Sequence, residues 1–158
     1  MRKIFSLILI IINFFNTLKN IIEKQIFRYN FQNSGCYLGF DVKFFNPDQI
    51  KIGNNVFIGD KVLMNAGKGG KILVGENVAI AEGVKIISWL KEVDQKNNEK
   101  KIICKNVIIG NYCRIGYNAI IMPGVKIGDG AKISPLSVVY HDVPADDIVM
   151  GNPAQSIK

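Results

Sequence analysis

Few residues of this sequence could act as an acid, a base or a metal ligand near neutral pH. His141 is the single histidine, and the three cysteines, Cys36, Cys104 and Cys113, form no CxxC pair. One imidazole cannot build a metal site that needs several, so we expect no metal. An odd number of cysteines without such a pair is typical of a reducing compartment, and we interpret each thiol as a small buried hydrophobic group.

His141 is also the single imidazole available for acid–base catalysis. It lies in the segment Val139-Tyr-His-Asp-Val-Pro144, which we interpret as a turn. A lone histidine in a turn is more often solvent-exposed than catalytic, so direct chemistry by His141 is the alternative rather than the first interpretation. Glu92 and Asp94 are other candidate bases, but carboxylates on a loop normally titrate too low to be efficient ones.

A six-residue repeat organises most of the chain that must position these groups. Each unit opens with an aliphatic residue, the second position is usually small, and the fifth is always Val, Cys, Ala or Ser. The units begin at Ile52, Ile58, Val74, Ile80, Ile103, Ile109, Ile115, Ile121, Ile127 and Ile133.

A period of six matches neither an α-helix nor a long strand, but it fits a short strand followed by a tight turn. Position five of one unit and position one of the next are two residues apart, so both side chains lie on the same face of a strand. Stacked units would bury a column of Ile beside a column of Val, Ala and Cys, with Gly and Asn in turns that need positive φ. No unit can bury its apolar face alone, so the sequence predicts a long all-β array.

The repeat resembles the bacterial hexapeptide-repeat acyltransferases, which include the maltose, galactoside and colanic-acid O-acetyltransferases. The similarity runs from Phe40 to Lys158 and is most specific from Asn106 to Gly130, followed by Gly151-Asn-Pro-Ala154. The resemblance implies a left-handed parallel β-helix with three hexads per triangular coil, which we place at residues 36–158. It also implies an acyltransferase with acetyl coenzyme A as the acyl donor.

The same resemblance implies where the donor binds. In the family, coenzyme A lies in a groove between adjacent subunits of a homotrimer, held mainly by backbone groups of the later coils. The matching positions here are Tyr117, Pro135, Tyr140, His141, Gln155 and Lys158. Two of them depart from the family: Pro135 lacks the N–H of the usual small residue, and Gln155 stands where a basic residue often meets the phosphates. Both tyrosines could instead be exposed turn residues.

The general base of the family is absent. The family places a histidine just after the hexad that matches Ile80–Lys85, and our alignment puts Trp89 at that position. A tryptophan has no basic nitrogen, since the indole N–H only donates. Asn65 resembles the asparagine that contacts the acceptor or the acetyl group in related enzymes, with turn formation as the alternative role. Arg114 replaces a common aromatic residue, and a cation there suits an anionic ligand or a solvated face.

Two interruptions break the repeat. Asn65-Ala-Gly-Lys-Gly-Gly70 adds four residues, and the stretch from Trp89 to Lys101 is expected to form a polar loop. Long loops that leave a rigid solenoid commonly carry function. In the family, an extended loop at a similar point helps cover the site of a neighbouring subunit. A solvated loop is the alternative, and the two interpretations are compatible.

The N-terminal segment, residues 1–30, differs from the repeat in composition. Eight of the nine residues from Ile4 to Ile12 are apolar, and the segment holds five basic residues against one acidic residue in a chain of net charge +7. We expect one or two helices over residues 2–30, because apolar residues recur at helical spacing, but no convincing membrane span. The segment either packs on its own domain or a neighbouring subunit, or lies in the interface of an anionic membrane.

Two functions are consistent with these features. The first is an acetyl-coenzyme-A-dependent O- or N-acetyltransferase of a bacterial sugar, such as a polysaccharide or lipid-linked saccharide precursor, in the cytoplasm or at the inner face of the membrane. The second is a catalytically impaired or non-catalytic trimeric scaffold. Outside residues 1–30 the charge is modest, which argues against a nucleic-acid partner. The residues before the repeats leave no room for the nucleotide-binding domain that a sugar nucleotidyltransferase would need.

Overall fold

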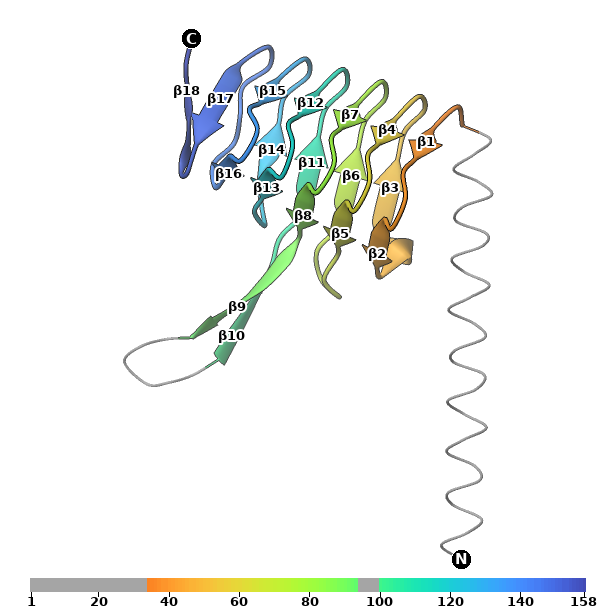
Figure 1. Cartoon of the computed structure of the whole chain (residues 1–158). Helices are drawn as coiled ribbons and strands as arrows, with labels where there is room; N and C mark the ends of the chain where they lie inside the picture. The colour runs from red at the N-terminus through yellow and green to blue at the C-terminus, as the bar shows by residue number, and fades with distance from the viewer. Residues whose placement is uncertain (1–33, 94–99) are drawn as a thin grey trace, which may run out of the picture.

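The computed structural model describes residues 34–93 and 100–158, and these residues form a parallel β-helix. Short strands follow one another around the three faces of a prism, and each pairs with the equivalent strand of the next coil (Figure 1). The helical segment expected at residues 1–30 lies outside the described residues. Within them, no helix has the length and apolar character needed to cross a bilayer.

Each face of the prism is one sheet. Face A is a seven-stranded sheet made of β1 (Tyr37–Leu38), β4 (Phe57–Ile58), β7 (Ala79–Ile80), β12 (Arg114–Ile115), β15 (Lys132–Ile133), β17 (Ile148–Gly151) and β18 (Ala154–Ser156). Face B is five-stranded and holds β2 (Lys43–Phe45), β5 (Leu63–Asn65), β8 (Lys85–Ile87), β13 (Ile120–Ile121) and β16 (Val138–Val139). Face C is four-stranded and holds β3 (Ile50–Ile52), β6 (Ile72–Val74), β11 (Val107–Ile109) and β14 (Lys126–Ile127). A 3-10 turn, η1 (Pro47–Gln49), precedes β3.

The core is the pair of side-chain columns that the repeat predicts. Buried first-position residues are Ile58, Val74, Ile80, Ile109, Ile115, Ile121, Ile127 and Ile133, and buried fifth-position residues are Val56, Val62, Val78, Val84, Val107, Cys113, Ala119, Val125, Ala131 and Ser137. Ile52 packs against this core but is only partly buried, because it belongs to the first described coil. Each fully buried isoleucine contributes roughly 1.5–3 kcal/mol to folding.

The turns between the strands contain residues in the left-handed region of φ. Asn55, Asn77 and Asn118 adopt it, as the repeat predicts for asparagine. Three bulky residues, Lys61, Tyr112 and Leu136, adopt it as well. We expected Gly and Asn at these positions, and the three residues show that other residue types occupy them too. The strands on either side of a corner are packed in the core, and this packing imposes the positive φ on the corner residue.

The second interruption is a β-hairpin rather than the expected polar loop. β9 (Trp89–Val93) and β10 (Lys100–Cys104) pair antiparallel and project away from the prism beyond β8 (Figure 1). The apolar residues of this stretch explain the difference, since Leu90 pairs with Ile103 in the hairpin register. Branched aliphatic residues favour strands, and pairing satisfies backbone groups that an irregular loop would leave to water.

Candidate active site

Asn65 and Trp89 meet at the base of the hairpin. Asn65 is the last residue of β5, and Trp89 begins β9 where the chain leaves β8 of the next coil. The indole N–H of Trp89 donates a hydrogen bond of 2.9 Å to Oδ1 of Asn65, and both residues are half-buried. The residue at the expected base position is therefore a hydrogen-bond donor to the residue at the expected acceptor-contact position.

Ser88 anchors the loop that follows Asn65 to the base of the hairpin. Its side chain is fully buried, and its hydroxyl accepts from the Gly67 N–H over 2.8 Å and donates to the Gly70 carbonyl over 3.0 Å. The Ser88 carbonyl accepts from the Lys105 N–H over 2.9 Å, where the chain returns to the prism. Ser88 was not singled out from the sequence, although the glycines of the first interruption were a signal of close packing there.

The first interruption passes close to Trp89, and this approach requires glycine. A Cβ placed on Gly67 would lie 2.6 Å from the Cβ of Trp89 and 3.1 Å from Sγ of Cys104. Cys104 is the partner of Trp89 in the hairpin register. The loop thus packs against the root of the Trp89 side chain, with Cys104 beside it, and this packing favours the orientation of the indole toward Asn65.

This arrangement can orient an oxygen atom but cannot remove a proton. Because an indole N–H only donates, it fixes which end of the Asn65 amide faces Trp89. The NH2 group of Asn65 then has no acceptor among the residues described by the structure. It can donate to a carbonyl or hydroxyl oxygen of a ligand, which is the chemistry of an oxyanion donor.

Tyr117 and Pro135 lie in neighbouring turns at the corner between faces A and B. The Leu136 N–H donates to the Tyr117 carbonyl over 2.8 Å, so the two turns are joined directly. A Cβ on Gly116 would lie 2.6 Å from the nitrogen of Pro135, so the turns stack without a side chain between them. The Tyr117 and Pro135 side chains are both exposed.

Tyr140 and His141 lie at the next corner, directly after β16 of face B, and both are exposed. The following residue stabilises this turn, because Oδ1 of Asp142 accepts from the Lys126 N–H over 2.8 Å. His141 itself forms no hydrogen bond or ion pair with any residue in the ranges 34–93 and 100–158. The structure therefore gives His141 no partner that would orient it as a base within one chain.

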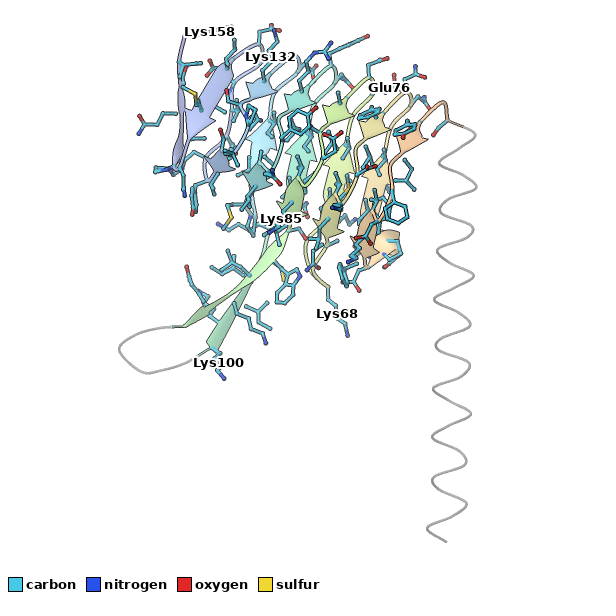
Figure 2. All side chains as sticks on the ribbon, in the orientation of Figure 1. Lys68, Glu76, Lys85, Lys100, Lys132 and Lys158 are labelled. Atoms are coloured by element: carbon cyan, nitrogen blue, oxygen red, sulfur yellow. The ribbon has the colours of Figure 1, made fainter. Side chains whose placement is uncertain are left out.

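Gln155 and Lys158 belong to the C-terminal end of the prism, where Figure 2 labels Lys158. Gln155 lies in β18 opposite Met150 of β17, and it is exposed. The Lys158 ammonium donates to the backbone carbonyl of Asp146. The structure thus gathers the expected donor-contact residues on the later coils, whereas Asn65 and Trp89 lie on earlier ones.

A shallow pocket of about 300 Å³ opens on the outer side of face A. It reaches the corner turn that carries Tyr117. The residues that line it include Phe57, Ala79, Glu82, Arg114, Tyr117 and Lys132. Arg114 and Tyr117 were singled out from the sequence. The other four were not, because their proximity depends on which strands pair across the coils.

Comparisons with known proteins agree with this geometry. A family model described as bacterial transferase hexapeptide (six repeats) matches residues 106–141. The protein YvoF of Bacillus subtilis (strain 168), provisionally named an acetyltransferase, is 32% identical over 145 residues, which cover 91% of this chain and 78% of that protein.

Two solved structures extend the similarity to three dimensions. A hexapeptide-repeat acetyltransferase from Vibrio cholerae O1 biovar eltor, complexed with acetyl coenzyme A, is 28% identical with a TM-score of 0.66, over 86% of this chain and 76% of that chain. A galactoside acetyltransferase in complex with coenzyme A is 27% identical with a TM-score of 0.72, over 78% of this chain and 62% of that chain. These likenesses indicate that the β-helix has the expected left-handed form.

Proposed function

This chain belongs to the bacterial hexapeptide-repeat transferases, and from that membership we propose that it transfers an acetyl group from acetyl coenzyme A to a hydroxyl or amino group of a sugar. The observation that carries the proposal is the likeness in fold to two acetyltransferases whose structures hold acetyl coenzyme A or coenzyme A. The exposed corner turns of Tyr117, Pro135 and Tyr140 support it, since they leave backbone and ring surfaces open to a donor.

The reaction is a substitution at the thioester carbonyl. The oxygen or nitrogen of the acceptor attacks the carbonyl carbon, a C–O or C–N bond forms, and the C–S bond breaks. The acceptor loses one proton, and coenzyme A leaves as the thiol once its sulfur has gained one. Negative charge develops on the carbonyl oxygen during the attack. We propose that the NH2 group of Asn65 donates a hydrogen bond to this oxygen and stabilises the charge.

Removal of the acceptor proton is the step for which this chain lacks the histidine of its family. A neutral amine can attack before it loses its proton, whereas a hydroxyl needs a base during the attack. Because Trp89 supplies none, we propose an amino sugar as the preferred acceptor. The sugar in the name of the galactoside acetyltransferase supports a saccharide as the substrate class.

We further propose that the chain assembles as a homotrimer, with the donor bound between subunits. Large apolar side chains stand exposed at the corner beside the proposed donor site: Tyr117 is 55% exposed and Leu136 is 72% exposed. An exposed apolar patch next to a ligand groove is typical of a surface that a neighbouring subunit covers.

The test uses purified full-length protein, acetyl coenzyme A with a radioactive acetyl group, and a panel of sugars and amino sugars. We expect calorimetry to show coenzyme A binding and at least one amino sugar to become labelled. Binding without transfer to any acceptor would support the non-catalytic scaffold instead. Absence of binding would overturn the proposal.

A matched pair of variants locates the donor. Tyr117→Ala should weaken coenzyme A binding about 10-fold, a loss of roughly 1.4 kcal/mol. Phe40→Ala is the control, because Phe40 is also an exposed aromatic residue, in a turn of the first coil. Equal effects of the two substitutions would remove Tyr117 from the donor site.

A further inference from the structure

The outward side chains of face A form one continuous column. Strand register places Tyr37 beside Phe57, Phe57 beside Ala79, Ala79 beside Arg114 and Arg114 beside Lys132. Paired strands lie about 4.8 Å apart, so consecutive members of the column are direct neighbours. The column is aromatic on one side of Ala79 and cationic on the other. The pocket on face A lies around Ala79 and includes residues of both kinds.

The aromatic side of the pocket is a flat surface. The rings of Tyr37 and Phe57 are stacked with centroids 4.8 Å apart and planes 5° from parallel, and both residues are exposed. Ala79 is too small to cover the neighbouring ring. The pocket wall formed by Phe57 can therefore receive the apolar C–H face of a sugar ring, as aromatic walls of ligand sites commonly do.

The cationic side carries two unneutralised charges. Arg114 and Lys132 are paired in register on β12 and β15, and both are exposed. Neither forms an ion pair with an acidic residue in the described part of the chain. Figure 2 labels Lys132 on β15. Like charges at opposed positions of a sheet repel each other, and an anion between them would remove that cost.

Glu82 adds a polar group with an unmet hydrogen-bonding requirement. It lines the same pocket, and its Oε2 is buried without a hydrogen-bond donor among the residues that the structure describes. An unpaired buried carboxylate oxygen is costly, so a rotation of the Glu82 side chain that lets a ligand hydroxyl donate to this oxygen would be favourable. A sugar presents such hydroxyls on its ring.

We propose that this pocket binds an anionic saccharide, with its phosphate or carboxylate against Arg114 and Lys132, its ring against Phe57, and a hydroxyl donating to Glu82. The volume of about 300 Å³ lies at the low end for ligand pockets, so it fits one sugar unit rather than a chain. Tyr117 links this pocket to the corner assigned to the donor. The saccharide therefore binds beside the donor corner and apart from Asn65 and Trp89, and this binding does not depend on the proposed function.

The first test measures binding to full-length protein by calorimetry without any acetyl donor. The probes are glucose 1-phosphate, glucuronate, glucose and inorganic phosphate. We expect one of the two anionic sugars to bind at least 10-fold more tightly than glucose and than inorganic phosphate, and the tighter of the two identifies the anion. Equal binding of glucose, equal binding of inorganic phosphate, or no binding of either anionic sugar would overturn the proposal.

The second test uses charge-removing variants. Lys132→Gln and Arg114→Gln should each weaken binding of the preferred anionic sugar at least 10-fold and reduce its dependence on salt. Lys126→Gln is the matched control, because Lys126 is also an exposed lysine directly before a buried hexad isoleucine, but on face C. Circular dichroism melting checks that all three variants fold. Equal affinity of the Lys132 variant and the control would overturn the proposal.

Coenzyme A binding to the same samples separates this inference from the proposed function. If Arg114→Gln loses the anionic sugar but keeps coenzyme A, the pocket is a saccharide site separate from the donor site. If it loses coenzyme A to the same extent, the two cations belong to the donor site and the inference is wrong. If wild-type protein binds the anionic sugar but no coenzyme A, the proposed function fails while the pocket stands.

Discussion

The indole nitrogen of Trp89 donates a hydrogen bond of 2.9 Å to Oδ1 of Asn65, between two neighbouring coils of the prism. A hydrogen-bond donor thus occupies the position at which the sequence resemblance predicts a proton acceptor. Trp89 begins the hairpin and packs against the loop at Gly67, so the bond belongs to a fixed arrangement. We expect the NH2 group of Asn65 to hold an acyl oxygen, whereas neither Asn65 nor Trp89 can take a proton.

The first prediction concerns this missing base. Trp89→His should raise O-acetyl transfer on the order of 10²-fold, a typical gain from a positioned general base. The pH–rate profile of the variant should rise through the pKa of an imidazole, near about 6.5, whereas the profile of the wild-type protein should not. Initial rates with a hydroxyl acceptor measure both effects. Trp89→Phe is the control, since it removes the bond to Asn65 without adding a base, and a gain equal to that of the histidine variant would contradict the explanation.

The second prediction concerns the buried hydroxyl that joins the loop to the hairpin. Ser88→Ala should lower the free energy of unfolding by about 1–3 kcal/mol, because it leaves the Gly67 N–H and the Gly70 carbonyl without their partner. Urea denaturation measures the change. Ser134→Ala is the control, because the Ser134 side chain is only half-buried and has no hydrogen bond in the described ranges. A similar loss in both variants would show that the hydroxyl of Ser88 is not what stabilises the loop.

The third prediction concerns the isoleucine column. Ile121→Asp should prevent folding, because it would bury an unpaired charge in a site that is 0% exposed. Ile121→Val should cost only about 0.5–1.5 kcal/mol and leave the fold intact. Circular dichroism and thermal unfolding report both outcomes, with Lys51→Asp on the outside of β3 as the control. A soluble Ile121→Asp variant with an unchanged spectrum would be incompatible with the buried column.

The fourth prediction concerns the thiol of Cys113. Burial raises the pKa of Cys113 from 9.0 to about 11, and its sulfur lies 3.1 Å from the Gly128 carbonyl to which it donates. The thiol therefore stays protonated in the folded state at pH 8, and a disulfide reagent should label it only after unfolding. The raised pKa leaves stability unaffected below pH 9. Above that value the unfolded chain releases the proton first, so stability falls as pH approaches 11.

Thiol counting with and without denaturant tests this assignment. Cys113→Ala should reduce the number of thiols that react in denaturant and leave the native number unchanged. It should also weaken the loss of stability between pH 9 and 11. Rapid labelling of Cys113 in the native protein would show that the site is open to solvent.

The fifth prediction concerns assembly. Light scattering should give a mass three times the 17.6 kDa of one chain. Leu136→Asp should reduce that mass, because it places a charge on an exposed apolar side chain beside the proposed interface, and aspartate tolerates the positive φ found there. Phe40→Asp on the first coil should not. A monomer at micromolar concentration would contradict both the trimer and a donor site between subunits.

The hexad predicted the core well because each position has a fixed direction in the coil. Ile121 opens a unit and is buried as expected, whereas Ile103, which also opens a unit, lies half-buried in β10 of the hairpin. The surface was harder, since the neighbours of an outward residue depend on strand register. Arg114 lies beside Ala79 only because the chain makes the hairpin excursion and returns to the same coil. The place of Glu82 beside Arg114 and Tyr117 also depends on coil register, and no local pattern in the sequence signals it.

The reversal of the chain at β18 determines how the prism ends. The strands of face A are parallel from β1 to β17. The last strand of the sheet, β18, pairs antiparallel with β17. A parallel solenoid with a bare terminal strand is a template for further strands of the same direction, including those of other copies. Because an antiparallel strand presents differently spaced hydrogen-bonding groups, it interrupts that template. The short C-terminal hairpin thus gives face A a last strand that does not continue the parallel pairing.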